Sequence, residues 1–122
     1  MRKKSVEEIL KIYLESAEIT KNALMSGDYK KCNKEGAKLL KCFKQFEVDK
    51  DYGFNCIDSL LLCENEIVRT DAATYCLALN YRVEDAEKIL QEIASDKSNG
   101  IFGFNAEMTL KVWKEQGYLK IY

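Results

Sequence analysis

No proline occurs in the 122 residues of this chain, and only six glycines interrupt it. Proline and glycine are the residues that least suit a helix interior, so their scarcity leaves long segments in which helices can continue. Hydrophobic residues make up 47% of the chain, which is too apolar for a disordered protein. The length suits one domain with a substantial buried core. We therefore expect a single all-α domain over residues 1–122.

The first fifty residues carry the pattern of a helical hairpin. Ser5 and Glu8 have the spacing of a capping box, and apolar residues then recur with helical spacing until Gly27, which predicts a helix over residues 6–25. Asp28 can cap a second helix, whose apolar positions continue to Phe46. The connection is short, so we expect the two helices to be antiparallel.

Four more helices follow from the rest of the pattern. A break is expected at residues 49–53, followed by an apolar third helix over residues 54–63 that contains Cys56 and Cys63 on one face. A fourth helix covers residues 65–78, a fifth covers residues 84–94, and a sixth covers about residues 104–116 and ends at Gly117. The chain should thus form about six helices in antiparallel pairs.

The stretch over residues 65–78 is typical of a helix in a HEAT-type repeat. Its apolar residues recur at steps of three and four, and the adjacent pair Ala72 and Ala73 allows a neighbouring helix to approach closely. A helix of this kind needs flanking helix pairs to cover its apolar stripe, and stacked pairs commonly leave a surface that binds another macromolecule. We therefore expect a HEAT-like right-handed α-α superhelix. The apolar stripe consists of Val68, Ala72, Tyr75, Cys76 and Leu79.

Residues 100–106 combine glycine with aromatic side chains, which would suit a ligand-binding loop. The interpretation we favour is that the glycines permit a tight crossing of two helices. Phe102 and Phe104 would then close the end of the stack, and Trp113 would anchor the core.

Residues that could perform catalysis or bind a metal are scarce. The chain has no histidine, which removes the commonest general base and the usual partner of a catalytic cysteine. The five cysteines include no Cys-x-x-Cys pair, and we expect them to be small buried side chains and not metal ligands or disulfides. No nucleotide-binding or hydrolase motif occurs. We therefore expect no enzymatic activity, no cofactor and no metal site.

We predict the location of the protein from two features that the sequence does not show, a secretory signal and a membrane-spanning segment. Met-Arg-Lys-Lys is followed by Ser-Val-Glu-Glu and not by the apolar region of a secretory signal, and no apolar run reaches membrane-spanning length. We expect a cytoplasmic protein with no membrane partner.

Charge is distributed unevenly along the chain. Residues 1–50 contain twelve Lys or Arg and eight acidic residues, whereas residues 51–122 contain seven and twelve. Lys30, Lys34, Lys38 and Lys41 fall on one side of the second predicted helix and could contact phosphates. Nucleic-acid binding is nevertheless disfavoured, because the pI is about 5.6 and no aromatic residues interleave the lysines.

The acidic residues of the second half define a candidate partner-binding surface. They cluster near the ends of the third to fifth helices, where their negative field would attract a basic protein. The alternative is that these acids only stabilise the N-termini of their own helices, and both interpretations can hold together. Tyr81 and Arg82 are a possible anchor pair beside them. The candidate binding residues are Glu64, Glu66, Asp71, Tyr81, Arg82, Glu84 and Asp85.

Two stretches resemble a known family: residues 66–73, and residues 86–93 followed by 104–113 and Gly117. They are similar to small bacterial all-helical domains with HEAT-like pairs. Some members of this family look like immunity proteins of contact-dependent growth inhibition and related polymorphic toxin systems. The resemblance implies an immunity protein that binds one cognate toxin domain, a nuclease in many such systems, and blocks it without catalysis. The alternative is a HEAT-like scaffold or adaptor for a peptide or protein, and the oligomeric state stays open.

Overall fold

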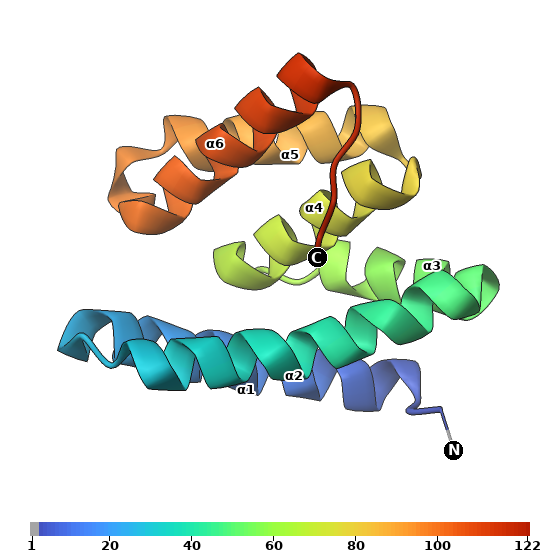
Figure 1. The fold of residues 1–122 in the computed structure, drawn as a ribbon, viewed down its shortest axis with the longest axis horizontal. Helices are drawn as coiled ribbons and strands as arrows, with labels where there is room; N and C mark the ends of the chain where they lie inside the picture. The colour runs from blue at the N-terminus through green and yellow to red at the C-terminus, as the bar shows by residue number, and fades with distance from the viewer. Residues whose placement is uncertain (1–2) are drawn as a thin grey trace. The chain divides into compact units, whose positions relative to one another are not determined.

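The computed structural model describes residues 3–122, and all regular structure within them is helical (Figure 1). The predicted all-α fold with six α-helices is thereby confirmed. The chain forms two compact units, Met1–Ser59 and Leu60–Tyr122, and the boundary between them in the sequence falls within the third helix. The single domain and the right-handed superhelix stay predictions. The elements are α1 (Val6–Ser26), α2 (Tyr29–Val48), α3 (Lys50–Leu61), α4 (Glu66–Leu79), α5 (Val83–Ser95), the short 3₁₀ helix η1 (Lys97–Asn99) and α6 (Ile101–Gln116).

In the first unit, α1 and α2 form the predicted hairpin and lie side by side (Figure 1). The hydroxyl of Ser5 accepts a hydrogen bond from the Glu8 amide, and the Glu8 carboxylate accepts one from the Ser5 amide. At the other end of α1, Gly27 adopts the left-handed conformation, with a φ of 76°. Asp28 then caps α2 by accepting a hydrogen bond from the Lys31 amide. The buried core residues of this unit are Ile9, Tyr13, Ala17, Ala23, Cys42, Phe43, Phe46, Cys56 and Ile57.

The junction between α2 and α3 differs from the expected break over residues 49–53. Only Asp49 separates the two helices, and its carboxylate accepts a hydrogen bond from the Tyr52 amide in the first turn of α3. Gly53 lies inside α3, because its lack of a side chain allows the helix to approach the backbone of Phe46. Cys63 follows the end of α3, so the expectation that Cys56 and Cys63 share one helix face was wrong.

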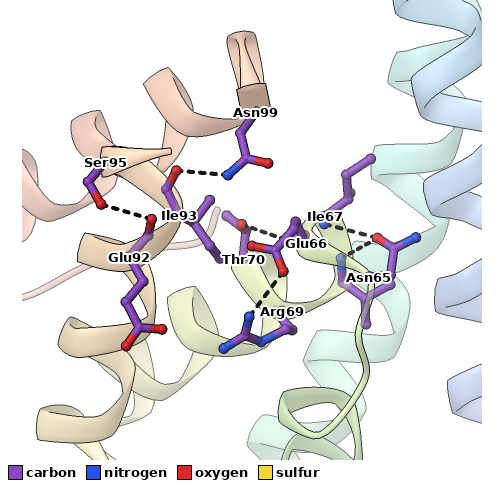
Figure 2. A network of polar contacts seen from close by, with 10 residues as sticks. Asn65, Glu66, Ile67, Arg69, Thr70, Glu92, Ile93, Ser95 and Asn99 are labelled. Atoms are coloured by element: carbon purple, nitrogen blue, oxygen red, sulfur yellow. Dashed lines mark hydrogen bonds and ion pairs between the residues drawn. The ribbon is translucent and has the colours of Figure 1, made fainter. Parts of the chain in front are cut away.

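In the second unit, α4 is the first complete helix, and it begins with an N-cap at Asn65. The side-chain oxygen of Asn65 accepts a hydrogen bond from the Ile67 amide (Figure 2). It also accepts one from the Val68 amide. Helix α4 then packs against α5, and α5 packs against α6. Ala72 and Ala73 are both fully buried, as their small size in the sequence predicted. The other buried residues of this unit are Leu60, Leu61, Val68, Tyr75, Cys76, Leu77, Ala86, Leu90, Ile93, Ala106 and Leu110.

The connection between α5 and α6 is more regular than expected. It contains η1, and the side chain of Asn99 donates a hydrogen bond to the Ile93 carbonyl (Figure 2). Helix α6 begins at Ile101 and not near residue 104, with Gly103 inside it. A Cβ at Gly103 would lie 3.2 Å from the Ile93 carbonyl oxygen, so this glycine permits the tight crossing that the sequence predicted. Phe104, in contrast, is 57% exposed and does not close the end of a stack.

Candidate protein-binding surface

The predicted binding residues at the start of α4 form one small group. Glu64 is exposed in the connection before the helix, and Glu66 is its first residue. The Glu66 carboxylate accepts a hydrogen bond from the Arg69 guanidinium at 3.0 Å (Figure 2). Glu64 is exposed, whereas Glu66 is half-buried and its charge is partly balanced within its own helix.

A second group lies at the other end of α4. Tyr81 and Arg82 form the connection to α5, and Arg82 has a φ of 48°, in the left-handed region that side chains seldom adopt. The Nε of Arg82 donates to the Asp85 carboxylate at 3.1 Å. Glu84 and Asp85 are exposed in the first turn of α5, where the helix dipole favours acids. The structure therefore brings Tyr81, Arg82, Glu84 and Asp85 together.

The two groups do not form one continuous acidic surface. The fourteen residues of α4 separate them, which corresponds to about 21 Å along the helix axis. Asp71 lies between the groups near the middle of α4 and is half-buried. Burial raises the pKa of Asp71 to about 7. Its negative charge is therefore incomplete at neutral pH, which the sequence did not indicate.

Sequence reasoning missed an exposed apolar stripe on α6. Its members recur at steps of three, four and four, so they lie on the helix face opposite the buried Gly103, Ala106 and Leu110. The sequence pattern predicts the helix without distinguishing its two apolar faces. We call the stripe the α6 outer face. It consists of Ile101, Phe104, Met108 and Val112, which are 53%, 57%, 38% and 37% exposed.

One ion pair shows which end of α6 lies beside the start of α5. We call the first turn of α5, with Glu84 and Asp85, the acidic turn. Lys114 contacts the Glu87 carboxylate at 3.3 Å and thereby holds the C-terminal end of α6 beside the first turns of α5. Val112 therefore lies toward the end of the unit that carries Glu84 and Asp85. Exposed apolar side chains and exposed acids at the same end of one unit combine apolar contact with charge, which suits protein recognition.

Within residues 3–122, no three His, Cys, Asp or Glu side chains are grouped so that they could hold a metal ion. None of the helices in this part of the chain has the length and apolarity needed to cross a membrane. All five cysteines are free thiols, three of them buried and two half-buried.

Comparison with known proteins adds no relative: no protein-family model matches the chain, and no curated protein and no solved structure matches it significantly.

Proposed function

We propose that this chain is an immunity protein that binds a cognate bacterial toxin domain in the cytoplasm of the producing cell and neutralises it by protein–protein contact. The observation that carries the proposal is the α6 outer face, where four apolar side chains are exposed on a helix that already has a buried face. Helices that are apolar on both faces normally have both faces covered. A stripe with a polar surround is the usual form of a protein-binding site.

The acidic turn supplies a second element of recognition. Glu84 and Asp85 extend from the first turn of α5 at the end of the unit where Val112 lies. A toxin that acts on nucleic acid carries a basic surface, which this turn would attract during the approach of the two proteins. Apolar contacts along α6 would then determine how long the complex persists, because buried apolar side chains chiefly affect dissociation.

The direct test measures binding and protection together. The chain is combined with the toxin domain encoded beside its gene, and the affinity is measured by calorimetry while growth of toxin-expressing cells reports protection. Replacing Ile101 and Phe104 by alanine should weaken binding by about tenfold or more, because both are exposed apolar side chains on the contact face. The control is Leu62→Ala, which removes an apolar side chain that is 86% exposed outside α6.

Reversing the charges of the acidic turn distinguishes electrostatic attraction during the approach of the toxin from contact within the complex. The double variant Glu84→Lys and Asp85→Lys should slow association at low ionic strength and have less effect at high salt. The variant Glu15→Lys and Glu18→Lys makes the same charge change at exposed positions of α1 and serves as its control. The proposal fails if the wild-type chain neither binds the toxin nor protects cells, or if the α6 variant and the Leu62 variant behave alike.

A scaffold or adaptor is the second candidate, and the spacing of the α6 outer face favours it. Exposed residues at steps of three and four can accept the apolar face of a partner helix. Such a protein would bind a helical peptide through α6 but would not rescue cells from the toxin. The growth measurement therefore distinguishes the two candidates.

A further inference from the structure

The first unit contains a pocket that the proposed function does not use. It lies between the start of α1, the C-terminal half of α2 and the first turn of α3, and its volume is about 270 Å³. This is slightly below the roughly 300–1,000 Å³ of most small-molecule sites, so it suits a compact ligand. One face of α2 lines the pocket with four side chains, which follow one another at three, four and seven positions after the first. They are Lys38, Lys41, Cys42 and Gln45.

Four lysines surround the pocket: Lys3, Lys4, Lys38 and Lys41. Lys3 contacts Asp49, which lowers the pKa of that carboxyl and keeps it ionised at neutral pH. Lys38 lies 3.6 Å from the Glu35 carboxylate. Within residues 3–122, neither Lys4 nor Lys41 has an ion-pair partner. With two of the four lysines compensated, the lining retains a net charge of about two positive units.

The inner wall is apolar and chemically inert. Ile9, Ile12 and Cys42 line it, and Cys42 is 9% exposed. Burial raises the pKa of the Cys42 thiol, while Lys4 and Lys38 act weakly in the opposite direction. The thiol is therefore neutral at physiological pH and contributes an apolar contact, not a nucleophile.

Tyr52 holds the N-terminal lysines over the pocket. Its hydroxyl donates a hydrogen bond to the Lys4 carbonyl at 2.6 Å, and the Lys3 ammonium lies 5.5 Å from the centre of its ring. Burial, with neighbouring Cys56, raises the pKa of Tyr52 far above its ordinary value, so the phenol stays protonated and remains a donor. The segment that carries Lys3 and Lys4 is thus fixed by a hydrogen bond and by a cation–π contact.

We propose that this pocket binds a phosphate monoester of a compact apolar or aromatic group. A phosphate monoester carries a charge of about −1.5 to −2 near neutral pH, which matches the charge that the lysines retain. Lysine ammonium groups bind phosphate as point charges and do not require the planar geometry that arginine imposes. The apolar wall formed by Ile9, Ile12 and Cys42 would receive the body of the ligand.

Phenyl phosphate is a suitable probe, and its binding to the full chain can be followed by amide chemical shifts. Millimolar phenyl phosphate should shift residues around the pocket in both α1 and α2, and added salt should weaken the binding. Inorganic phosphate tests the head group alone, benzoate tests a single negative charge, and benzyl alcohol tests the apolar body alone. All three should bind more weakly than phenyl phosphate.

Two matched double variants test the lysines. Lys4→Gln with Lys41→Gln removes the two uncompensated charges and should weaken phenyl phosphate binding by about tenfold. Lys30→Gln with Lys34→Gln removes equal charge from exposed positions of α2 outside the pocket and should have little effect. Circular dichroism should show that both variants keep their helices, since all four side chains are exposed.

Three results would overturn the proposal. The first is the absence of shifts at the pocket with millimolar phenyl phosphate. The second is an equal loss of binding in the two double variants, which would indicate diffuse attraction to a basic surface. The third is binding of benzoate, benzyl alcohol or inorganic phosphate as tight as that of phenyl phosphate. Because the pocket lies in the first unit, none of these results bears on toxin binding by α6.

Discussion

A Cβ atom on Gly53 would lie 2.6 Å from the carbonyl oxygen of Phe46 and 2.7 Å from its Cα. Backbone atoms cannot move aside as a flexible side chain can, so α3 passes α2 at a distance that only glycine allows. The position explains why a residue that normally weakens a helix occurs inside one.

This contact predicts opposite effects for two glycine-to-alanine substitutions. Gly53→Ala should destabilise the protein, because overpacking costs about 1–3 kcal/mol and exceeds the gain of about 0.5–1 kcal/mol in helix propensity. Gly36→Ala in α2 should stabilise it by about 0.5–1 kcal/mol, since a Cβ there meets nothing within 4 Å. Urea unfolding measures both variants. Equal effects of the two would contradict the close approach.

The N-cap of α4 predicts that two substitutions of Asn65 differ in their effect on the free energy of unfolding. Asn65→Ala removes the acceptor for the Ile67 and Val68 amides, which lie 2.9 Å and 3.2 Å from it, and should cost about 1 kcal/mol in the free energy of unfolding. Asn65→Asp keeps the acceptor and should stay close to wild type. Thermal or urea unfolding provides the comparison, and an aspartate variant as unstable as the alanine variant would argue against capping.

Asp71 should make the free energy of unfolding depend on pH at values where most carboxyl groups are already fully ionised. Because burial raises its pKa in the folded state to about 7, folding favours the protonated form. Its contribution is fully present below the unfolded pKa of about 4 and is lost as pH rises through about 7. The stability of Asp71→Asn relative to wild type should therefore increase between about pH 5 and pH 7.5 in urea unfolding.

Asp96→Asn is the matched control for this pH series. Hydrogen bonds from the Ser98 hydroxyl and amide lower the pKa of Asp96. The Asp96 carboxylate therefore stabilises the folded state at pH values above its unfolded-state pKa, and this contribution is lost only as the pH falls below that value. Its effect on stability should stay constant between about pH 5 and pH 7.5. A constant effect of Asp71→Asn over the same range would show that the Asp71 carboxyl is not buried in solution.

The thiols should differ in reactivity toward an alkylating reagent. Burial raises the pKa of both Cys42 and Cys56, which lowers the thiolate fraction as well as access. Cys32 and Cys63 are half-buried and should react first in the folded protein. Mass spectrometry after brief alkylation near neutral pH identifies the modified positions, with urea-unfolded protein as the control in which all five react. Early labelling of Cys56 would contradict its burial.

The helices were largely predictable because their signals are local. The capping box at Ser5, the cap at Asp28 and the stops at Gly27 and Gly117 all act within a few residues of the chain. The N-cap at Asn65 is equally local, although the sequence pattern placed this residue inside the helix. The sequence placed Gly53 in a break and Gly103 ahead of the sixth helix, although both lie inside helices, because a glycine that breaks a helix and a glycine that admits a neighbouring helix look the same in sequence. Only the position of Phe46 or Ile93 distinguishes the two cases. For Gly103 the tight crossing was nevertheless predicted, and only the start of the helix differs.

The candidate surface was harder to predict than the helices. Charge alone grouped Glu64 with Glu84, although α4 separates them, and the burial of Asp71 depends on packing that no spacing reveals. The α6 outer face did have a local signal, since residues 101, 104, 108 and 112 follow helical spacing. The buried residues of α6 follow the same spacing on the opposite face, and only the packing of α5 shows which face is covered.

The connections between the α-helices contain one to five residues each, and this brevity limits where a protease can cut the folded chain. Among residues 3–122, the basic side chains outside the six α-helices are Lys3, Lys4, Arg82, Lys97 and Lys120. Trypsin therefore meets few peptide bonds that are not held in an α-helix. Brief digestion should yield a small set of large fragments, bounded by these five positions.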